Sequence, residues 1–570
     1  MMTHPRTCPR KQGSQQPTLR TVIGMSLTLF TISAVSTMAL LDKASAQTGK
    51  LATPLAVDWR FTGNPYGNNP STPVVGNGSV YFTSGNHIYA TSSTTGTLKW
   101  QFPEGGAVFN SYITVSPALK GNTLLVGGGD AMYAIDTNTG KQKWRYNLTQ
   151  GGVTTSPVVV EDNVYFIAAG RILGLNVETG DSLGGNWGGR TRAGVDAGGE
   201  IITDMALMDH YLLYGTPDVL RSVDTVSGNL KWSTNITGLD HISQPVVSGD
   251  TFSMIVGSTL VTRRISGLVK RSIPLPVAGV VPPATDADGN LYVVTEDRHV
   301  YALNAQLKGI WKSSPILDYL PLAAPVVSNG ILVVSTALGG VYAYDTATGQ
   351  LKWNYRITPS GVDNKRVPLR TNIACKSAVS GGSLFVLSDD GTLTAFRHDA
   401  VDGLPPVVTI VEPEQGDYVS GKAPFIISAR LNDQGSGLDT SSIVFKLDGQ
   451  SIPKRPAGVD EGKGTDFEFI SDEGVVRFVT RESDGVGGSL KDGHHTATVS
   501  ARDWMGNTVI KTWVFYTDLT FPRKSRRPNA NPNGGFPGGG GTSPSGAGGF
   551  GGSGGGPGGK GGGGAGGGGN

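Results

Sequence analysis

One pattern of apolar and polar positions recurs eight times between residues 59 and 400. Each unit opens with a Pro and a few apolar residues, turns at Gly or Asn, and continues as a β-branched run. It then reads Tyr-Ala-(Leu/Ile)-Asp and ends with Thr-Gly-x-x-Lys-Trp, most clearly in APVVSNGILVVSTALGGVYAYDTATGQLKWNY from Ala324 to Tyr355. Short apolar runs between turn residues predict short strands, and no segment of this body has a sustained helical period.

The spacing of the units predicts a propeller. A period near 42 residues, built from four short strands, is typical of a propeller blade. The openings fall at Pro73, Pro117, Pro157, Met205, Pro245, Pro283, Pro325 and Ala378. The closing positions, 39 to 45 residues apart, are Trp59, Trp100, Trp144, Trp187, Trp232, Arg271, Trp311 and Trp353. We therefore predict an all-β chain with an eight-bladed β-propeller over residues 51–402, in which the recurrent Trp side chains pack between blades.

The turns and the two ends of the repeat predict how the ring closes. Asp136, Asp224 and Asp345 each begin an Asp-x-x-(Thr/Ser)-Gly segment, which suits a hairpin turn with Gly at positive φ. Trp59 precedes the first opening, whereas the last unit ends at residues 396–398 without a Trp strand. A strand carrying Trp59 is therefore expected to complete the eighth blade and leave no open sheet edge.

A second domain is predicted at residues 404–520. After Leu404-Pro405-Pro406 the chain alternates apolar and polar residues in VVTIVEP, FIISARL, SIVFKLDG, GVVRFVT, HTATVSARD and TVIKTWVFY. Roughly seven short strands in this length indicate a β-sandwich. The segments 433–439 (DQGSGLD) and 501–507 (ARDWMGN) resemble those of bacterial immunoglobulin-like modules, which implies a spacer or an adhesive unit. Trp504 is expected at a turn, either exposed or in a small satellite core.

Residues 1–46 are predicted to be an export signal. Four basic residues precede an uncharged apolar run at 21–41, and Ala44-Ser45-Ala46 offers a small-x-small cleavage site. An uncleaved membrane anchor is the alternative, because about 20 residues can just span a bilayer. The Ser and Thr residues within the run favour cleavage.

The C-terminal segment 521–570 is predicted to be disordered. It begins with Arg523, Lys524, Arg526 and Arg527, and 24 of the 37 residues from Gly534 onwards are Gly. Such a composition buries too little surface to offset chain entropy. We interpret this segment as a solvated spacer or as a basic arm that contacts an anionic wall, lipid or polysaccharide.

Charge and composition exclude some functions. Charged residues make up 16% of the chain and its formal charge is +2, which argues against a nucleic-acid binder. Without residues 1–46, 42 basic residues face 44 acidic ones, and residues 47–520 alone carry −7. Gly (84) and Pro (33) make up about a fifth of the chain, which fits a turn-rich β protein.

The units of Tyr-Ala-(Leu/Ile)-Asp and Thr-Gly-x-x-x-Trp, repeated in register, resemble the pyrroloquinoline-quinone (PQQ) repeat family over residues 51–402. The resemblance implies one of two branches. Quinoprotein dehydrogenases bind PQQ and Ca²⁺ at the propeller centre and carry an adjacent Cys pair, whereas cofactor-free propellers such as the BamB-type assembly factors are interaction platforms. Cys375 is the one Cys after residue 46. No catalytic, cofactor-binding or metal-binding residue is therefore assigned.

Binding residues are predicted on the two long connections into inner strands, residues 184–203 and 356–376. Loops on a rigid scaffold carry function, and guanidinium groups suit carboxylates or phosphates. The candidates for partner or ligand contact are Arg190, Arg192, Lys365, Arg366 and Arg370, with ordinary solvated loop charges as the alternative. Residues 286–290 have a calcium-loop spacing without its distal Glu, and His494-His495 lack a nearby third ligand.

The sequence thus predicts an exported, non-catalytic PQQ-like propeller that binds or scaffolds at the cell envelope. Its partner would be an envelope protein or a polysaccharide, and its location the periplasm, the cell surface or the medium. A PQQ-dependent dehydrogenase with an atypical site and a wall- or carbohydrate-binding adhesin remain the alternatives.

Overall fold

The computed structural model describes residues 50–63, 71–104, 109, 113, 115–184, 187, 194–236, 242–358, 370–456, 465–480, 488–522 and 526–527. The predicted signal and most of the predicted tail lie outside these ranges. The named elements are the strands β1–β41 and one 3-10 helix, η3 (Ala337–Gly339). Among the described residues, no helix combines the length and apolar character needed to cross a membrane.

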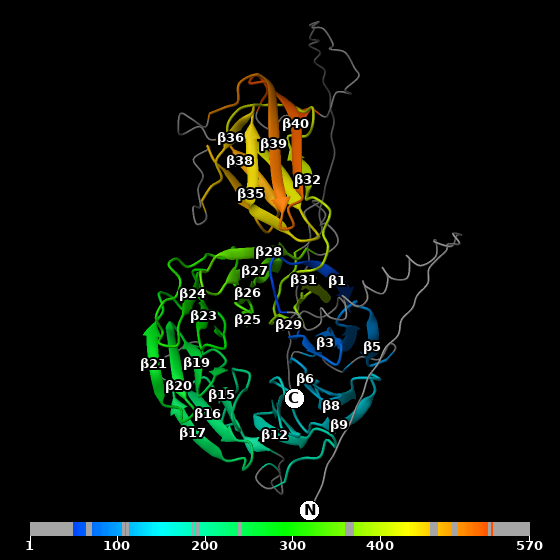
Figure 1. Cartoon of the computed structure of the whole chain (residues 1–570), viewed down its shortest axis with the longest axis vertical. Helices are drawn as coiled ribbons and strands as arrows, with labels where there is room; N and C mark the ends of the chain where they lie inside the picture. Colours follow the sequence, from blue (N-terminus) through cyan, green and yellow to red (C-terminus); the bar gives the residue numbers. More distant parts are fainter. Residues whose placement is uncertain are drawn as a thin grey trace, which may run out of the picture.

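The described part of residues 50–402 forms seven four-stranded antiparallel sheets and one three-stranded sheet. In Figure 1 the sheets surround a common centre, with inner strands such as β25 towards it and outer strands such as β21 and β9 at the rim. The strands of the sheets, in chain order, are β2–β5 (Val74–Gly76, Ser79–Ser84, His87–Ser92, Leu98–Phe102), β6–β9 (Ala118–Lys120, Thr123–Gly127, Ala131–Asp136, Gln142–Asn147), β10–β13 (Val158–Val160, Asn163–Ala168, Arg171–Asn176, Val195–Asp196), β14–β17 (Ala206–Met208, Tyr211–Gly215, Val219–Asp224, Leu230–Asn235), β18–β21 (Val246–Ser248, Thr251–Val256, Thr259–Arg264, Val269–Pro274), β22–β24 (Ala284–Thr285, Leu291–Val294, Val300–Leu303), β25–β28 (Val326–Ser328, Ile331–Ser335, Gly340–Asp345, Leu351–Arg356), and β29–β31 with β1 (Ala378–Ser380, Ser383–Leu387, Thr392–Arg397, Ala56–Thr62).

Burial explains the apolar runs. Every residue of β3 and of β7 is buried, whereas β9 at the rim alternates between exposed and half-buried positions. The middle strands of each sheet are covered on both faces by neighbouring sheets, so their sequences are continuously apolar. Clusters of apolar side chains join successive sheets, as Trp100 does by packing with residues of β3 and β7.

The ring closes through its first strand. β1 pairs antiparallel with β31, and Trp59 lies opposite Ala395. The inner strands β2 and β29 also contact each other, so the first sheet in the chain neighbours the last. The pairing confirms the prediction that the strand carrying Trp59 completes the final sheet.

The three-stranded sheet is the irregular member. The segment after β24 makes only isolated bridges, Leu303 with Gly309 and His299 with Ile316, in place of a fourth named strand. In the sheet before it, Arg271 stands at the closing position, and its Nη1 donates to the carbonyl of Ala305 over 3.1 Å. A guanidinium therefore links this sheet to the next at a position that Trp occupies in other units.

The C-terminal region forms two sheets around one core. The strand orders are β32–β34–β38–β37 and β36–β35–β39–β40–β33–β41, with one parallel pair, β33 and β40. Apolar side chains from both sheets meet between them, where Ile427, Phe445 and Trp513 are buried together. This region is therefore a β-sandwich. Its strands are β32 (Val407–Glu412), β33 (Tyr418–Val419), β34 (Ile426–Asn432), β35 (Leu438–Leu447), β36 (Gln450–Ile452), β37 (Phe467–Ile470), β38 (Val475–Val479), β39 (Gly493–Asp503), β40 (Thr508–Thr517) and β41 (Arg526–Arg527).

The sandwich strands agree in part with the alternating sequence pattern. The six quoted segments coincide with β32, β34, β35, β38, β39 and β40. The strands that the pattern does not predict, β33, β36, β37 and β41, are two to four residues long, too short to show an alternation. β41 belongs to the segment predicted to be disordered, yet it pairs antiparallel with β33.

The sandwich lies against the rim of the ring, beside β28 and β31 (Figure 1). The indole N–H of Trp353 in β28 donates to the carbonyl of Ser436 over 2.8 Å. Trp504, at the turn after β39, packs against the propeller cluster that contains Trp353. The two domains therefore share a contact surface at the last two sheets of the propeller.

Candidate functional site

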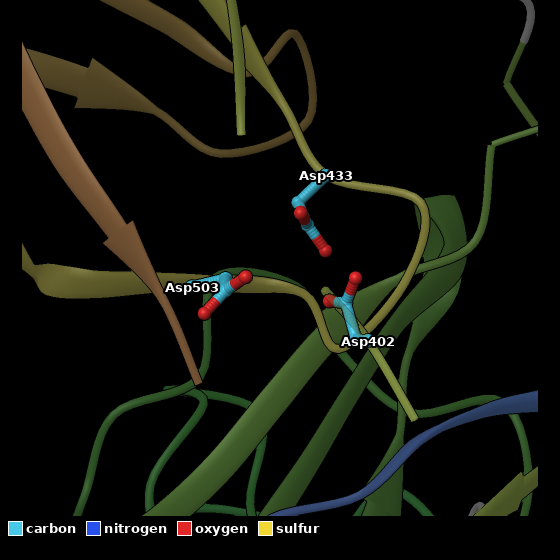
Figure 2. Close-up of side chains that lie close together, drawn as sticks. All are labelled: Asp402, Asp433 and Asp503. Carbon is cyan, nitrogen blue, oxygen red and sulfur yellow. The ribbon is translucent and has the colours of Figure 1, made fainter. Parts of the chain in front are cut away.

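Three carboxylates meet at the junction of the two domains. Asp402 follows the last propeller strand, Asp433 lies between β34 and β35, and Asp503 ends β39. One oxygen of each lies within 4.8 Å of the others, and Figure 2 shows the three side chains converging. Within the described ranges this is the group of acidic, His or Cys side chains that could hold a metal ion, and its oxygen donors would suit a hard cation.

Backbone amides hold two of these carboxylates. Asp433 Oδ1 accepts hydrogen bonds from the amides of Gly435 (3.1 Å) and Gly437 (2.6 Å). Asp402 Oδ2 accepts from the amide of Ser436 over 2.7 Å. The short loop 433–437 therefore binds both a carboxylate of its own and one from the end of the propeller.

The third carboxylate is held from within the sandwich. Asp503 accepts from the backbone amide of Asn507 (2.8 Å) and from its side-chain amide (2.7 Å). The same Asn507 side chain donates to the carbonyl of Asp402 over 3.0 Å. Asn507 thus connects the sandwich hairpin to the segment that leaves the propeller.

The close approach of the three carboxylates affects their protonation. Burial raises the pKa of Asp433 to about 6, and the charges of Asp402 and Asp503 add to the rise, while the amides of Gly437 and Gly435 oppose it. Bringing like charges together disfavours their ionised forms. The junction therefore favours a proton on Asp433 at mildly acidic pH.

The predicted binding residues lie mostly outside the described part of the chain. Arg190, Arg192, Lys365 and Arg366 fall in segments 188–193 and 359–369, which the structure does not describe. Arg370 is described, and its Nη2 lies 2.8 Å from Asp472 and 3.4 Å from Glu473 of the sandwich. The structure therefore gives Arg370 a partner within the chain, and contact with an external ligand stays a prediction.

The recurrent Trp residues link neighbouring sheets. The indole N–H groups of five of them donate to a backbone carbonyl of the next sheet's hairpin turn, at 2.7 to 2.9 Å, namely Trp100, Trp144, Trp187, Trp232 and Trp311. Trp353 donates instead to the sandwich. Trp59 is buried, and its ring lies against Gly96 of the first hairpin turn.

Cys375 is a core residue. It is 5% exposed and packs in the cluster that contains Trp59 and Phe385. Burial raises the pKa of its thiol to about 12, so the thiolate that reacts as a nucleophile is scarce at neutral pH. This position supports a packing role.

Two other segments weighed as metal sites have structural hydrogen bonds. Asp286 accepts from the amides of Asp288 (3.0 Å) and Asn290 (2.9 Å), as expected of a turn between β22 and β23. His495 is buried and contacts Asp448 Oδ2 and the carbonyl of Lys491, both at 2.8 Å. Both segments are accounted for by local structure.

The repeated antiparallel sheets, closed by an N-terminal strand, define a β-propeller of the PQQ-like repeat class. The sequence profile of a family described as outer membrane protein assembly factor BamB matches residues 27–203, 86–303 and 218–400, more than half of the chain. The chain belongs to this PQQ-like BamB β-propeller family.

Individual relatives match over shorter stretches. The chain is 29% identical over 131 residues to outer membrane protein assembly factor BamB of Moranella endobia (strain PCIT), covering 23% of this chain and 31% of that protein. It is 31% identical over 96 residues to the BamB of Burkholderia pseudomallei (strain K96243), covering 17% and 23%. These matches span less than a third of each relative.

Solved structures overlap the chain at low identity. BamB from Moraxella catarrhalis has a TM-score of 0.47 at 16% identity and covers 60% of this chain and 99% of its own. A europium-containing methanol dehydrogenase has a TM-score of 0.46 at 13% identity, with 60% and 93% covered.

Proposed function

We propose that this chain is an exported, non-catalytic propeller of eight blades that binds or scaffolds a partner at the cell envelope. The observation that carries the proposal is the family match across the repeated sheets. The relatives that it matches are named as outer membrane protein assembly factors, which supports a periplasmic or outer-membrane-associated location. The partner would be an envelope protein or a polysaccharide.

The residues present do not fit the PQQ-dependent branch. That branch implies an adjacent Cys pair, whereas Cys375 is the one Cys after residue 46 and lies in the core between sheets. The acidic group at Asp402, Asp433 and Asp503 lies at the junction with the sandwich, outside the inner strands of the ring. This donor chemistry supports the scaffold over the dehydrogenase.

The sandwich and the tail have supporting roles in this proposal. We assign residues 404–520 to an immunoglobulin-like module and residues 521–570, which carry five basic residues, to an arm that contacts an anionic surface. The adhesin alternative requires exposed aromatic side chains on the sandwich, and Trp504 packs against the propeller instead. This contact supports a role for the sandwich as a fixed extension of the ring.

A calorimetric titration tests the choice between scaffold and enzyme. PQQ with Ca²⁺ is titrated into residues 47–570, followed by a dye-reduction assay with simple alcohols and sugars. We expect neither heat nor turnover. Micromolar binding with turnover would replace the scaffold by a dehydrogenase.

Photo-crosslinking in cells tests the binding surface. A photoreactive residue is placed at Arg190 or at Arg366, with exposed Asp162 on the propeller as the control position. We expect one discrete envelope adduct from the two basic loops and none from position 162. Equal adducts at all three positions would remove the basic loops as the binding surface.

A further inference from the structure

In the last sheet of the propeller no hairpin turn connects the third and fourth strands, whereas both neighbouring sheets have one. In four other sheets a five-residue turn joins the third and fourth strands, and in a fifth sheet a turn of the same form follows the third strand, β12. In each of these turns the amide of the final Gly donates to the carbonyl of the first residue at 2.8 to 2.9 Å. These turns are residues 92–96, 136–140, 176–180, 224–228 and 345–349. In the last sheet the third strand is β31 and the fourth is β1, from distant parts of the chain, so no turn connects them.

These hairpin turns also contact the preceding unit of the propeller. In the turn 345–349, the carbonyl of Thr346 accepts the indole N–H of Trp311 over 2.8 Å. Gly349 has φ +75°, and a Cβ at this position would lie 2.7 Å from Cδ2 of Trp311. This turn therefore fits against the Trp that closes the preceding unit.

A sandwich loop occupies the corresponding place beside the last sheet. Residues 433–437 read Asp-Gln-Gly-Ser-Gly, the same Asp-x-x-(Thr/Ser)-Gly spacing as residues 224–228. The indole of Trp353 donates to Ser436, and Gly437, with φ +86°, would place a Cβ 2.7 Å from the carbonyl oxygen of Asn354.

The loop resembles the hairpin turns, but the Trp contacts fall at different positions within it. Trp353 bonds to the fourth residue of the loop, whereas Trp311 bonds to the second residue of its turn. Gly437 meets the backbone of β28, whereas Gly349 meets a Trp ring. The position and the type of contact are shared, and the atoms that make it differ.

The loop binds both chain segments that meet at the closure. The amide of Val57 in β1 donates to the carbonyl of Gly435 over 3.0 Å. Arg60, also in β1, donates to the carbonyl of Gln434 over 3.0 Å. The amide of Ser436 donates to the carboxylate at position 402, on the segment that leaves β31. One loop thus holds β1 and the end of the repeat region together.

We propose that residues 433–437 act as a surrogate hairpin turn that clamps the closing sheet of the propeller. The sandwich is then part of the ring closure, and loosening the loop exposes β1. This inference does not depend on the partner or on the location of the protein.

Hydrogen–deuterium exchange of residues 47–570 tests the proposal. In G437A, the added Cβ collides with the carbonyl of Asn354. G449A is the matched control, because Gly449 has φ +79° in the same domain and nothing within 4 Å of the added Cβ. We expect the amides of β1 to exchange at least tenfold faster in G437A and at the wild-type rate in G449A. Unchanged exchange in β1 of G437A would overturn the clamp.

A second pair of variants keeps the test decisive if G437A does not fold. W353F removes the N–H that bonds to Ser436, and W311F removes the N–H that bonds to Thr346. We expect W353F to speed exchange severalfold in β1 and in residues 435–437, and W311F to leave both segments unchanged. Equal effects of the two substitutions, or none from W353F, would contradict the proposal.

Discussion

The two neighbouring sheets β25–β28 and β29–β31 with β1 have the same strand order and different connections. The first is continuous in sequence, and its turn 345–349 follows directly from β27. The second is assembled from the two ends of the repeat region and is bound by a loop of another domain. The same four-stranded sheet can therefore be formed by one continuous segment or by segments far apart in the sequence. The sheet formed by distant segments depends on more of the chain.

The largest loss of stability is expected on substitution of Trp353, which lies in β28 and packs against the closing sheet. Its side chain is fully buried and contacts Phe396 of the closing sheet at a ring distance of 5.2 Å. Trp353→Ala should lower the free energy of unfolding by about 3–5 kcal/mol, because truncating a buried Trp leaves a cavity. Chemical denaturation measures it, with half-buried Trp144→Ala as the milder control. A similar loss in both variants would mean that the closing sheet is no more sensitive than the others.

The contributions of Asp345 and Asp433 to stability should depend on pH with opposite signs. Hydrogen bonding by Thr348 lowers the pKa of Asp345, so its contribution to stability is lost as the pH falls through that pKa. The pKa of Asp433 is raised to about 6, above the unfolded value of about 4. Its contribution is therefore fully present below about pH 4 and is lost as the pH rises through about 6. Denaturation of D433N between pH 4 and 7.5 should lack this fall, whereas D345N should keep it.

A smaller effect is expected from the hydroxyl of Tyr355, which contacts both β1 and the sandwich. It bonds to Arg60 Nη2 (2.5 Å) and to the carbonyl of Gln434 (3.1 Å). Tyr355→Phe should cost about 1 kcal/mol, the usual scale for such a bond. Thermal unfolding checks this, and a Tyr355→Phe protein as stable as the wild type would show that the hydroxyl contributes nothing to the closure.

The smallest effect is expected from Arg370. Its side chain is 45% exposed and is screened by solvent, and the Asp472 carboxylate, although only 7% exposed, also has a hydrogen bond with Tyr319. Arg370→Ala should change the unfolding free energy by less than about 1 kcal/mol. If Arg370 also contacts a partner, the same variant should weaken the crosslinks from the basic loops at unchanged stability. Loss of stability with unchanged crosslinking would make it a structural residue alone.

Most of the propeller could be predicted because its information is local and repeated. The turn at Asp345 and the buried strands around it can be identified from one unit, and the place of Trp59 before the first opening predicts the closure. The short sandwich strands, such as β33, could not be predicted, since two residues carry no periodicity.

The acidic junction could not be predicted from spacing, because Asp402, Asp433 and Asp503 are brought together only by domain packing. One signal could have linked the two domains. The loop 433–437 has the Asp-x-x-Ser-Gly spacing of the propeller turn at 224–228. Within the sandwich sequence alone, however, this segment indicates only a turn before a strand.

The pairing of β1 with β31 also sets an order of events during synthesis. The ribosome delivers residues 56–62 first, and their partner strand, residues 392–397, emerges only after seven sheets have been made. The loop 433–437 follows later still. The closing sheet therefore cannot be completed until residues 392–397 have been made, and it cannot be clamped until residues 433–437 have followed.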